Sequence, residues 1–315
     1  HQMACSQVLA CARLATGVGT VKILTSSYTL DISGVPTYTL TMYNELVKRG
    51  HEVVVYSPLS GAISPQLKVC QELELLGKPD VIIAQHRVCA EDLRKRFDST
   101  PMIFSAHGVI PDGEQPPNVY INWYTAINED GVEHLTSCGI DRDRITIVRD
   151  FIDMDKFRYI EPLRTSFPRL LFMDNHRKSK GVRMLRDIAS LCKLDLKTVG
   201  ATYGHSYDIH LTINDVDLVI TTGRGILEAM ACGRSAISCD NHGVGDGYID
   251  QRKYWTSRTR NFAGSKSLYT FSTETLMDEI LQYKPTPKIN IEFIYEYHNV
   301  VDGVTQLLDI SERIL

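Results

Sequence analysis

The stretch TTGRGILEAMACGRSAISCD, residues 221–240, combines a glycine-rich loop, a short helical segment and a second strand. The apolar run before it, residues 216–220, has the length and β-branched character of a strand. A strand, a glycine loop and a helix in this order place backbone N–H groups and the positive end of a helix dipole beside a cleft, which suits a bound phosphate. Glu228 lies about one turn into the helix, where its carboxylate would accept hydrogen bonds from vicinal sugar hydroxyls. The alternative is an ordinary βα turn with a solvent-facing glutamate.

The composition narrows the classes of protein to consider. With 315 residues, of which 43% are hydrophobic and 23% charged, the chain is large enough for one or two globular domains. The net charge of −4, with no strongly basic block in either half, gives no support for a nucleic-acid partner. No apolar run approaches the length of a membrane-spanning helix. The eight cysteines form no C-x-x-C pair and occur in apolar or helical contexts, so we expect reduced core residues in a cytoplasmic protein.

Residues 1–20, HQMACSQVLACARLATGVGT, differ from the rest of the chain. They lack a basic n-region, and Arg13 interrupts their apolar stretch, so a signal peptide is not indicated. The first convincing fold element begins at Val21. We therefore interpret residues 1–20 as vector sequence or an extension at the start site, and exclude them from the fold prediction.

From Val21 onward, short apolar runs alternate with helical segments, which predicts parallel sheets with helices on both faces. The alternation occurs in two units joined near residues 155–168, and a Pro-Thr-Pro break at 285–287 precedes a terminal helix. A single large doubly wound sheet is the competing architecture. We expect strands at residues 21–25, 51–56, 79–84, 102–105, 145–148, 169–173, 196–199, 218–221 and 235–238, and another within residues 120–127. We expect helices at residues 37–49, 129–138, 181–192, around Glu228, and at 273–282 and 291–310.

The segment GILEAMACGRSAI, residues 225–237, is similar to the donor-site segment of retaining glycosyltransferases of family 4 (group 1), which have the GT-B fold. In the interdomain segment, Asp150-Phe151 stands where the family usually has Asn-Gly. The resemblance extends, in the family's order, over the first glycine loop, the following strand ends and the interdomain segment, at residues 33–58, 77–86, 100–109 and 139–157.

The resemblance implies an α/β protein with two Rossmann-like domains that face a cleft. An acceptor-side domain would span residues 21–158, and a nucleotide-sugar domain would span residues 159–288. The C-terminal helix, within residues 289–315, is expected to cross back to the first domain.

The same resemblance assigns roles within the opening stretch. Glu228 corresponds to a glutamate that contacts the ribose of a sugar nucleotide. The family has an earlier glutamate, eight positions before, that contacts the donor sugar. Here that position is Ile220, and a loop about two residues shorter leaves Thr222 nearest to its place. The donor would then be bound by Thr222 and by the N–H groups of the loop Gly223-Arg224-Gly225. The Arg224 side chain would reach a phosphate or a charged sugar.

A cationic loop, NHRKSKG at residues 175–181, follows a predicted strand. In the family this loop carries an arginine, and then a lysine just before the glycine. Lys180 matches the lysine, Asn175 occupies the arginine position, and Arg177 and Lys178 are the nearest substitutes. Fixed cations would stabilise the charge that develops on a leaving diphosphate. The alternative is a solvated turn.

Two residues of the first unit complete the predicted site. Gly34 lies where the first strand meets its helix, and its lack of a Cβ lets the backbone approach a phosphate or sugar closely. His107 follows the strand at 102–105, at the carboxyl end where open α/β sheets bind ligands. In the family a histidine at this place touches the donor sugar. Each residue would otherwise be interpreted as structural.

These residues predict a retaining, metal-independent glycosyltransferase of the hexosyltransferase type, with His107, Lys180 and Glu228 as catalytic residues. It would use a nucleoside-diphosphate sugar as donor, need no cofactor, and act on a glycan, lipid or small-molecule acceptor. Two alternatives are a sugar-nucleotide epimerase, which would need additional carboxylates in the cleft, and a catalytically impaired sugar-nucleotide-binding subunit.

Other partners have weaker support in the sequence. Asp153-Met154-Asp155 has the spacing of an Asp-x-Asp metal motif but lies in the interdomain segment, so we expect no metal. The basic cluster Arg94-Lys95-Arg96 would allow peripheral membrane contact, although such a cluster is usually a solvated helix face.

Overall fold

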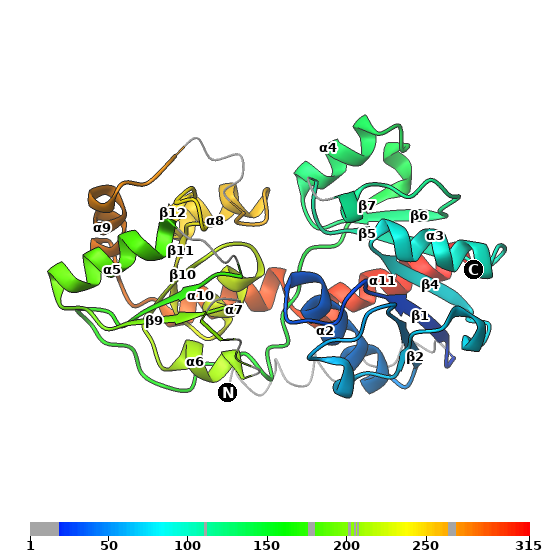
Figure 1. Cartoon of the computed structure of the whole chain (residues 1–315), viewed down its shortest axis with the longest axis horizontal. Coiled ribbons are helices and arrows are strands. Elements are labelled where there is room, and N and C mark those ends of the chain that lie inside the picture. Colours follow the sequence, from blue (N-terminus) through cyan, green and yellow to red (C-terminus); the bar gives the residue numbers. More distant parts are fainter. Residues whose placement is uncertain are drawn as a thin grey trace, which may run out of the picture.

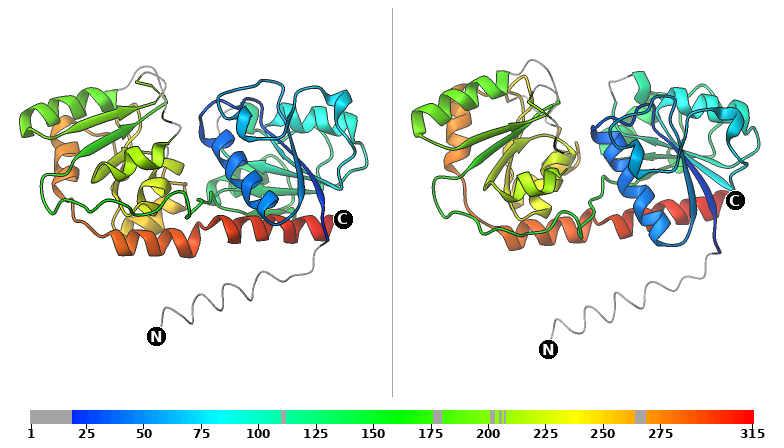
Figure 2. Two further views of the ribbon diagram at one scale, coloured as in Figure 1. Left: turned by 90° about the horizontal axis from the view of Figure 1, so that it is seen from below. Right: turned by 60° about the horizontal axis from the view of Figure 1, so that its bottom comes forward.

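The chain folds into two α/β domains that lie side by side (Figure 1). Each domain is built on a sheet of its own, which excludes the single doubly wound sheet. Figure 2 shows the C-terminal helices running along one side of both domains. The computed structural model describes residues 19–109, 112–175, 180–200, 203–204, 206, 208–263 and 269–315.

The first domain contains a parallel seven-stranded sheet with the strand order β3-β2-β1-β4-β5-β6-β7. Its central strands are continuous apolar runs because helices cover both faces. One face packs against α3 and α4, and the other against α2 and the C-terminal helix α11 (Val300–Ile314). The strands are β1 (Lys22–Ser26), β2 (Glu52–Tyr56), β3 (Val69–Cys70), β4 (Val81–Gln85), β5 (Met102–Ala106), β6 (Trp123–Ala126) and β7 (Ile145–Ile147). The helices are α2 (Gly34–Lys48), α3 (Arg87–Arg96) and α4 (Glu129–Ser137).

The second domain contains a five-stranded sheet with the order β12-β11-β10-β8-β9, parallel except for the edge strand β12. One face packs against α5 and α9, and the other against α7, α8 and α10. The strands are β8 (Leu170–Met173), β9 (Leu196–Val199), β10 (Leu218–Thr221), β11 (Ser235–Ser238) and β12 (Gly247–Tyr248). The helices are α5 (Lys180–Cys192), α6 (Ile209–Asn214), α7 (Arg224–Ala231), α8 (Gln251–Arg258), α9 (Thr273–Leu281) and α10 (Pro287–Tyr297).

The predicted return of the chain to the first domain is confirmed, but it takes two helices. The single helix predicted at residues 291–310 is wrong, because α10 ends at Tyr297 and α11 (Val300–Ile314) begins after Asn299. The Asn299 side chain caps α11 by accepting a hydrogen bond from the Val301 N–H. The interdomain segment inserts at the break, where the Ile152 N–H donates to the His298 carbonyl at 2.7 Å.

The interdomain segment is fixed by an aromatic contact. Phe151 is 1% exposed, and its ring lies 4.3 Å from the ring of Tyr38 in α2. Gly303 of α11 faces the same ring so closely that a Cβ on it would lie 2.2 Å from Phe151 Cδ1. A glycine at this position of the helix therefore allows α11 to approach the segment that joins the domains.

We expect Gly303→Ala to lower the free energy of unfolding by about 1–3 kcal/mol, because the added methyl overlaps a buried ring. An alanine in an unobstructed helix interior would instead be favoured by about 1 kcal/mol over glycine. Urea denaturation measures the change. Gly77→Ala, in a loop of the first domain, is the control for an unobstructed methyl, because nothing lies within 4 Å of a Cβ built there. Equal midpoints for the two variants would contradict the steric argument.

Two predictions about side chains need correction. Cys138 is exposed, so it is not a core residue. Cys89, Cys232 and Cys239 are buried, as predicted. All six cysteines of the described ranges are free thiols. Arg94 is not part of a solvated cluster, because it is buried and donates to carbonyl groups beyond the end of α3.

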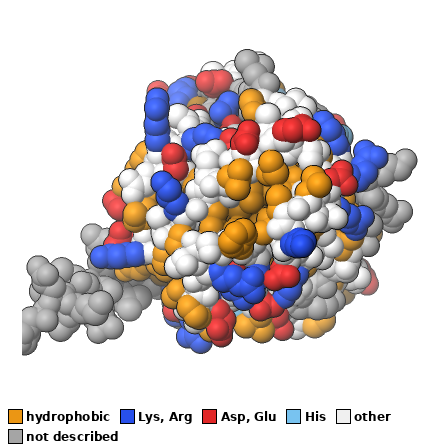
Figure 3. Space-filling model, turned by 90° about the vertical axis from the view of Figure 1, so that its left-hand side faces the viewer, with side chains coloured by type: hydrophobic (Ala, Val, Ile, Leu, Met, Phe, Trp, Pro, Cys, Tyr) orange, Lys and Arg blue, Asp and Glu red, His pale blue; other side chains and the backbone are white. Residues whose placement is uncertain are grey.

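The outer end of the second domain carries hydrophobic side chains that gather on one face (Figure 3). The most exposed large apolar side chains of this domain are Phe167, Leu191 and Leu281, each more than 70% exposed. Within the described ranges, no helix has the length and apolar character needed to cross a bilayer.

Candidate functional site

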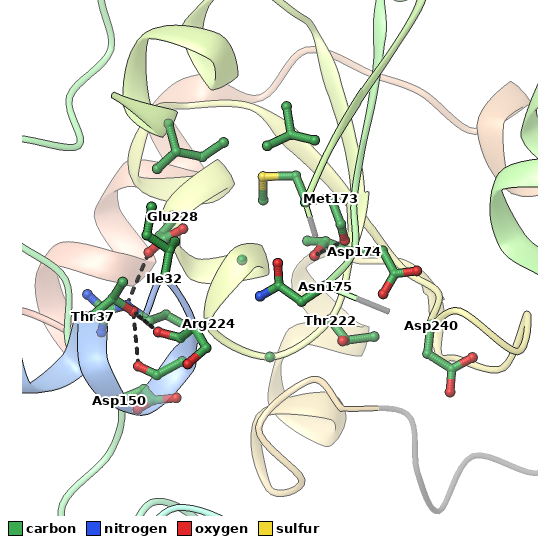
Figure 4. A pocket seen from close by; sticks show the side chains of 18 of the residues that line it. Ile32, Thr37, Asp150, Met173, Asp174, Asn175, Thr222, Arg224, Glu228 and Asp240 are labelled. Atoms are coloured by element: carbon green, nitrogen blue, oxygen red, sulfur yellow. Dashed lines mark hydrogen bonds and ion pairs between the residues drawn. The ribbon is translucent and has the colours of Figure 1, made fainter. Parts of the chain in front are cut away.

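A cavity of about 400 Å³ lies between the two domains. Its walls come from the loops that follow the strands, at the carboxyl ends of both parallel sheets, where open α/β sheets bind ligands. Figure 4 shows Thr37, Asp150, Arg224 and Glu228 together on one side of the cavity, and Asp174, Thr222 and Asp240 on another.

Most of the residues predicted from the sequence line this one cavity. From the first domain these are Gly34, after β1, and His107, after β5; from the second domain they are Thr222, Gly223, Arg224, Gly225 and Glu228, after β10. Asn175, after β8, also lines the cavity. Arg177 and Lys178 lie outside the described residues.

Lys180 is described but does not line the cavity. It is the first residue of α5, and its Nζ donates to the Phe271 carbonyl at 3.3 Å. Its backbone N–H donates to the carbonyl of Asn241, a residue of the cavity wall, at 2.7 Å. The lysine backbone therefore lies beside the cavity, while the ammonium group points to a neighbouring loop.

Two helices begin at the cavity wall. Residues 33–35 at the start of α2 and residues 223–225 at the start of α7 line it from opposite domains. The first N–H groups of a helix have no partner within the helix and carry the positive end of its dipole. At α7 the Gly223 and Gly225 N–H groups already donate to the carbonyls of Phe262 and Thr222, each at 3.3 Å, so this helix start favours an anion through its dipole. The start of α2 faces it across the cavity.

The glycines at these helix starts have distinct local functions. Gly223, before α7, has φ of +58°, a left-handed conformation that favours glycine. A Cβ on Gly225 would lie 2.7 Å from Thr221 Oγ1, so this glycine lets α7 begin close to the end of β10. A Cβ on Gly34 would meet no atom within 4 Å, which leaves open space beside the first turn of α2.

Glu228 projects from α7 and is largely buried, with a side chain 12% exposed. Its Oε1 accepts a hydrogen bond from Arg224 Nε at 3.1 Å, one turn earlier in the helix. Burial raises the pKa of Glu228, and the Arg224 guanidinium opposes that rise. The carboxylate has further acceptor capacity, so it suits a ligand that offers hydroxyl donors.

His107 forms part of the wall on the side of the first domain. Its backbone N–H donates to Glu114 Oε2 at 2.8 Å, and the Tyr38 ring packs against its imidazole at 4.5 Å. Burial lowers the pKa of His107 to about 3, with smaller contributions from His86 and Arg224. The imidazole is therefore neutral at physiological pH. Its Nε2 is shielded from water and has no hydrogen-bond partner among the described residues.

Two further carboxyl groups belong to this region and were not predicted from the sequence. Asp150 lines the cavity, and its Oδ2 accepts a hydrogen bond from Asn261 Nδ2 at 2.8 Å. Burial raises the pKa of Glu114 to about 7, and Glu114 fixes the backbone of the loop that carries His107. The replacement of the family's Asn-Gly by Asp150-Phe151 was the available signal for Asp150. Nothing in the sequence around Glu114 marked it.

The described residues contain no group of three or more His, Cys, Asp or Glu side chains arranged to hold a metal ion. Metal independence stays a prediction.

Because several histidines are buried in their neutral form, we expect them to lower the free energy of unfolding in acid. Burial lowers the pKa of His86 to about 4 and the pKa values of His107 and His298 to about 3. As the pH falls below about 6.5, the unfolded chain binds protons on these histidines and the native state does not, so the free energy of unfolding decreases. Each buried histidine contributes up to about 1.4 kcal/mol per pH unit. Glu114 has the opposite effect on the free energy of unfolding. Its raised pKa makes a stabilising contribution that is fully present below about pH 4.5 and is lost as the pH rises through about 7.

From pH 6.5 to pH 4.5 we therefore expect the three histidines to give the free energy of unfolding a destabilising slope, opposed by Glu114, Glu228 and Asp150, whose pKa values burial raises. His298→Gln should reduce this slope by up to about 1.4 kcal/mol per pH unit, whatever it does to stability at neutral pH. His298 is suited to the test because it does not line the cavity between the domains. Urea denaturation at a series of pH values measures the slope, and an unchanged slope in the variant would contradict the assignment.

Comparison with known proteins supports the fold. No protein-family profile matches the sequence, and no curated protein matches it. Solved structures match nearly the whole chain. A glycosyltransferase from Rickettsia africae ESF-5 superposes with a TM-score of 0.63 at 16% identity, covering 94% of this chain and 99% of that one. Anabaena Alr3699/HepE in complex with UDP-glucose superposes with a TM-score of 0.65 at 14% identity, covering 93% of this chain and 100% of that one.

A third similar structure is an α-glucosyltransferase in complex with UDP and a 13-mer DNA containing an HMU base. It has a TM-score of 0.63 at 10% identity and covers 93% of this chain and 100% of that one. Since this chain has two α/β domains and a C-terminal helix that returns to the first, it has the GT-B fold of these glycosyltransferases.

Proposed function

We propose that the protein is a glycosyltransferase that transfers a sugar from a nucleoside-diphosphate donor to an acceptor, with retention and without a metal ion. The observation that carries the proposal is the convergence of Glu228, Gly34 and His107 with two helix N-termini on one interdomain cavity. Residues from widely separated parts of the sequence meet there, which supports a site for a sugar nucleotide.

The nucleotide would bind mainly to the second domain. Glu228 would accept hydrogen bonds from the ribose hydroxyls, since a buried carboxylate with remaining acceptor capacity matches vicinal hydroxyl donors. Val199 and Ile209 supply an apolar part of the same wall, suited to the face of a base. Two of the similar structures described above were solved with a uridine nucleotide, HepE with UDP-glucose and the α-glucosyltransferase with UDP, which makes uridine diphosphate the first nucleotide to test.

The diphosphate would lie between the starts of α2 and α7. Cleavage of the bond between the anomeric carbon and the diphosphate oxygen leaves negative charge on the phosphates, and fixed N–H dipoles directed at that charge lower the barrier. Thr222 and His107 would then offer neutral hydrogen-bonding groups to the donor sugar from the two domains that line the cavity.

The decisive experiment is a panel of labelled nucleoside-diphosphate sugars, assayed for hydrolysis and for transfer to added acceptors. The anomeric configuration of the product tests retention, and a chelator added to the assay tests metal independence. Turnover excludes a purely sugar-nucleotide-binding subunit, and a transferred sugar of unchanged identity excludes an epimerase. Tight binding of nucleotide without turnover of any donor would instead favour the catalytically impaired subunit, which the missing first glutamate makes the second candidate.

We expect Lys180→Ala to reduce kcat about tenfold with a smaller effect on nucleotide affinity, because its charge would act on the leaving diphosphate. This requires the ammonium to leave the Phe271 carbonyl and turn toward the cavity rim. Steady-state kinetics and a separate nucleotide titration distinguish the two effects. A change confined to KM would contradict the role of Lys180 at the transition state.

A further inference from the structure

Arg224 connects three separate parts of the molecule. Its Nη2 donates to Thr41 Oγ1 in α2 of the first domain at 2.9 Å. Its Nη1 donates to the carbonyl of Phe151 in the interdomain segment at 2.7 Å. Its Nε donates to Glu228 Oε1 at 3.1 Å. The side chain is 7% exposed, so these hydrogen bonds are made largely out of contact with water.

Two buried carboxyl groups, those of Glu228 and Asp150, neighbour the Arg224 guanidinium. Burial raises the pKa values of Glu228 and Asp150, and in both cases the guanidinium opposes the rise. Arg224 thus stabilises two buried carboxylates of the cavity wall. Three of its N–H donors are already used, and the guanidinium fork is planar and rigid, so it cannot turn to a phosphate without releasing these partners.

We propose that Arg224 is a positioning residue that couples nucleotide binding at Glu228 to closure of the two domains. The inference rests on the proposed function, because it takes Glu228 as the nucleotide ligand. One rigid group contacts both the ligand-binding carboxylate and α2 of the opposite domain, so the orientation of Glu228 depends on α2 being in place. A ligand that binds this orientation more tightly shifts the population toward the closed state. By linkage, contacts that stabilise closure strengthen ligand binding equally.

Thr41 allows the coupling to be tested without altering the cavity. It does not line the cavity, and its hydroxyl donates to the Thr37 carbonyl at 2.8 Å, which leaves oxygen lone pairs for the Arg224 donor. Thr41→Val removes the acceptor and keeps the β-branched shape of the side chain. Thr305→Val is the matched control, because Thr305 Oγ1 accepts a hydrogen bond from Arg49 Nη1, also at 2.9 Å, within the first domain.

The experiment titrates UDP into each variant by calorimetry and measures the radius of gyration by X-ray scattering with and without UDP. Loss of part of the closed population raises the apparent dissociation constant in proportion. We expect Thr41→Val to bind UDP three- to tenfold more weakly and to compact less on binding. Thr305→Val should stay within twofold of the wild type. Thr41→Ser, which keeps the hydroxyl, should restore wild-type behaviour and shows that any loss in Thr41→Val is not a folding defect.

The outcomes separate the two proposals. If the wild type binds UDP and Thr41→Val matches it in affinity and compaction, the coupling is overturned and the proposed function stands. If neither UDP nor any other nucleoside diphosphate binds to the wild type, the proposed function fails and the coupling with it. If Thr41→Ser is as weak as Thr41→Val, the hydroxyl is not the coupling contact and the inference is wrong.

Discussion

Glu228→Gln is expected to weaken the binding of a nucleoside diphosphate ten- to a hundredfold. The substitution keeps the size of the side chain and removes its charge. Hydrogen bonds to a charged group are worth about 1.5–3 kcal/mol, which corresponds to that range in the dissociation constant. The effect should be large here because the side chain is only 12% exposed, so water cannot readily replace the lost acceptor. Calorimetric titration with the free nucleotide measures it.

The matched control is Glu292→Gln. Glu292 forms an (i, i+4) ion pair with Lys288 on the surface of α10, the same spacing as the pair between Arg224 and Glu228. Its side chain is 61% exposed, and pairs of this kind contribute little. Nucleotide affinity should be unchanged in this variant. An unchanged affinity in Glu228→Gln as well would remove the ribose contact from the proposed site.

Much of the fold was predictable because parallel strands covered on both faces appear in the sequence as continuous apolar runs. The central strands β4 and β5 are of this kind, and every residue in them is buried. Helix α3 was missed, since its sequence RVCAEDLRKR is highly charged and its contact with the core depends chiefly on Cys89, Ala90 and Leu93. The break between α10 and α11 was also missed, because it depends on a contact with Ile152, far away in the sequence.

In the site too, residues within one local sequence pattern were predictable, and contacts between residues far apart in the sequence were not. Glu228 and the glycine loop could be found because they belong to one continuous strand, turn and helix, so their spacing is visible in the sequence. The pairing of Asp150 with Asn261 spans 111 residues, and no local pattern reveals it. Lys180 was expected in the loop just before its helix, and the structure makes it the first residue of α5. The direction of its long side chain depends on its neighbours in space. Arg224 was expected to reach toward the ligand, whereas the structure places its guanidinium against Thr41 and Phe151.

His107→Ala is expected to reduce kcat about ten- to a hundredfold and to leave nucleotide affinity within twofold. The imidazole belongs to the first domain, whereas the proposed nucleotide contacts Glu228, Val199 and Ile209 belong to the second, so its loss should affect the donor sugar more than the nucleotide. Among the described residues Nε2 of His107 has no hydrogen-bond partner, which costs free energy that a sugar hydroxyl would recover on binding. If that contact tightens as charge develops on the sugar ring, it lowers the barrier more than it strengthens ground-state binding.

The pH profile tests how His107 acts. Because burial lowers its pKa to about 3, the ring stays neutral from pH 5 to pH 9 and cannot serve as a general acid there. The kcat of the wild type should therefore show no inflection from His107 in that range. Any inflection near pH 7 should arise from Glu114, whose pKa is raised to about 7, and should persist in His107→Ala measured at high enzyme concentration. Loss of that inflection in the variant would show that His107 itself titrates, and the neutral hydrogen-bonding role would have to be abandoned.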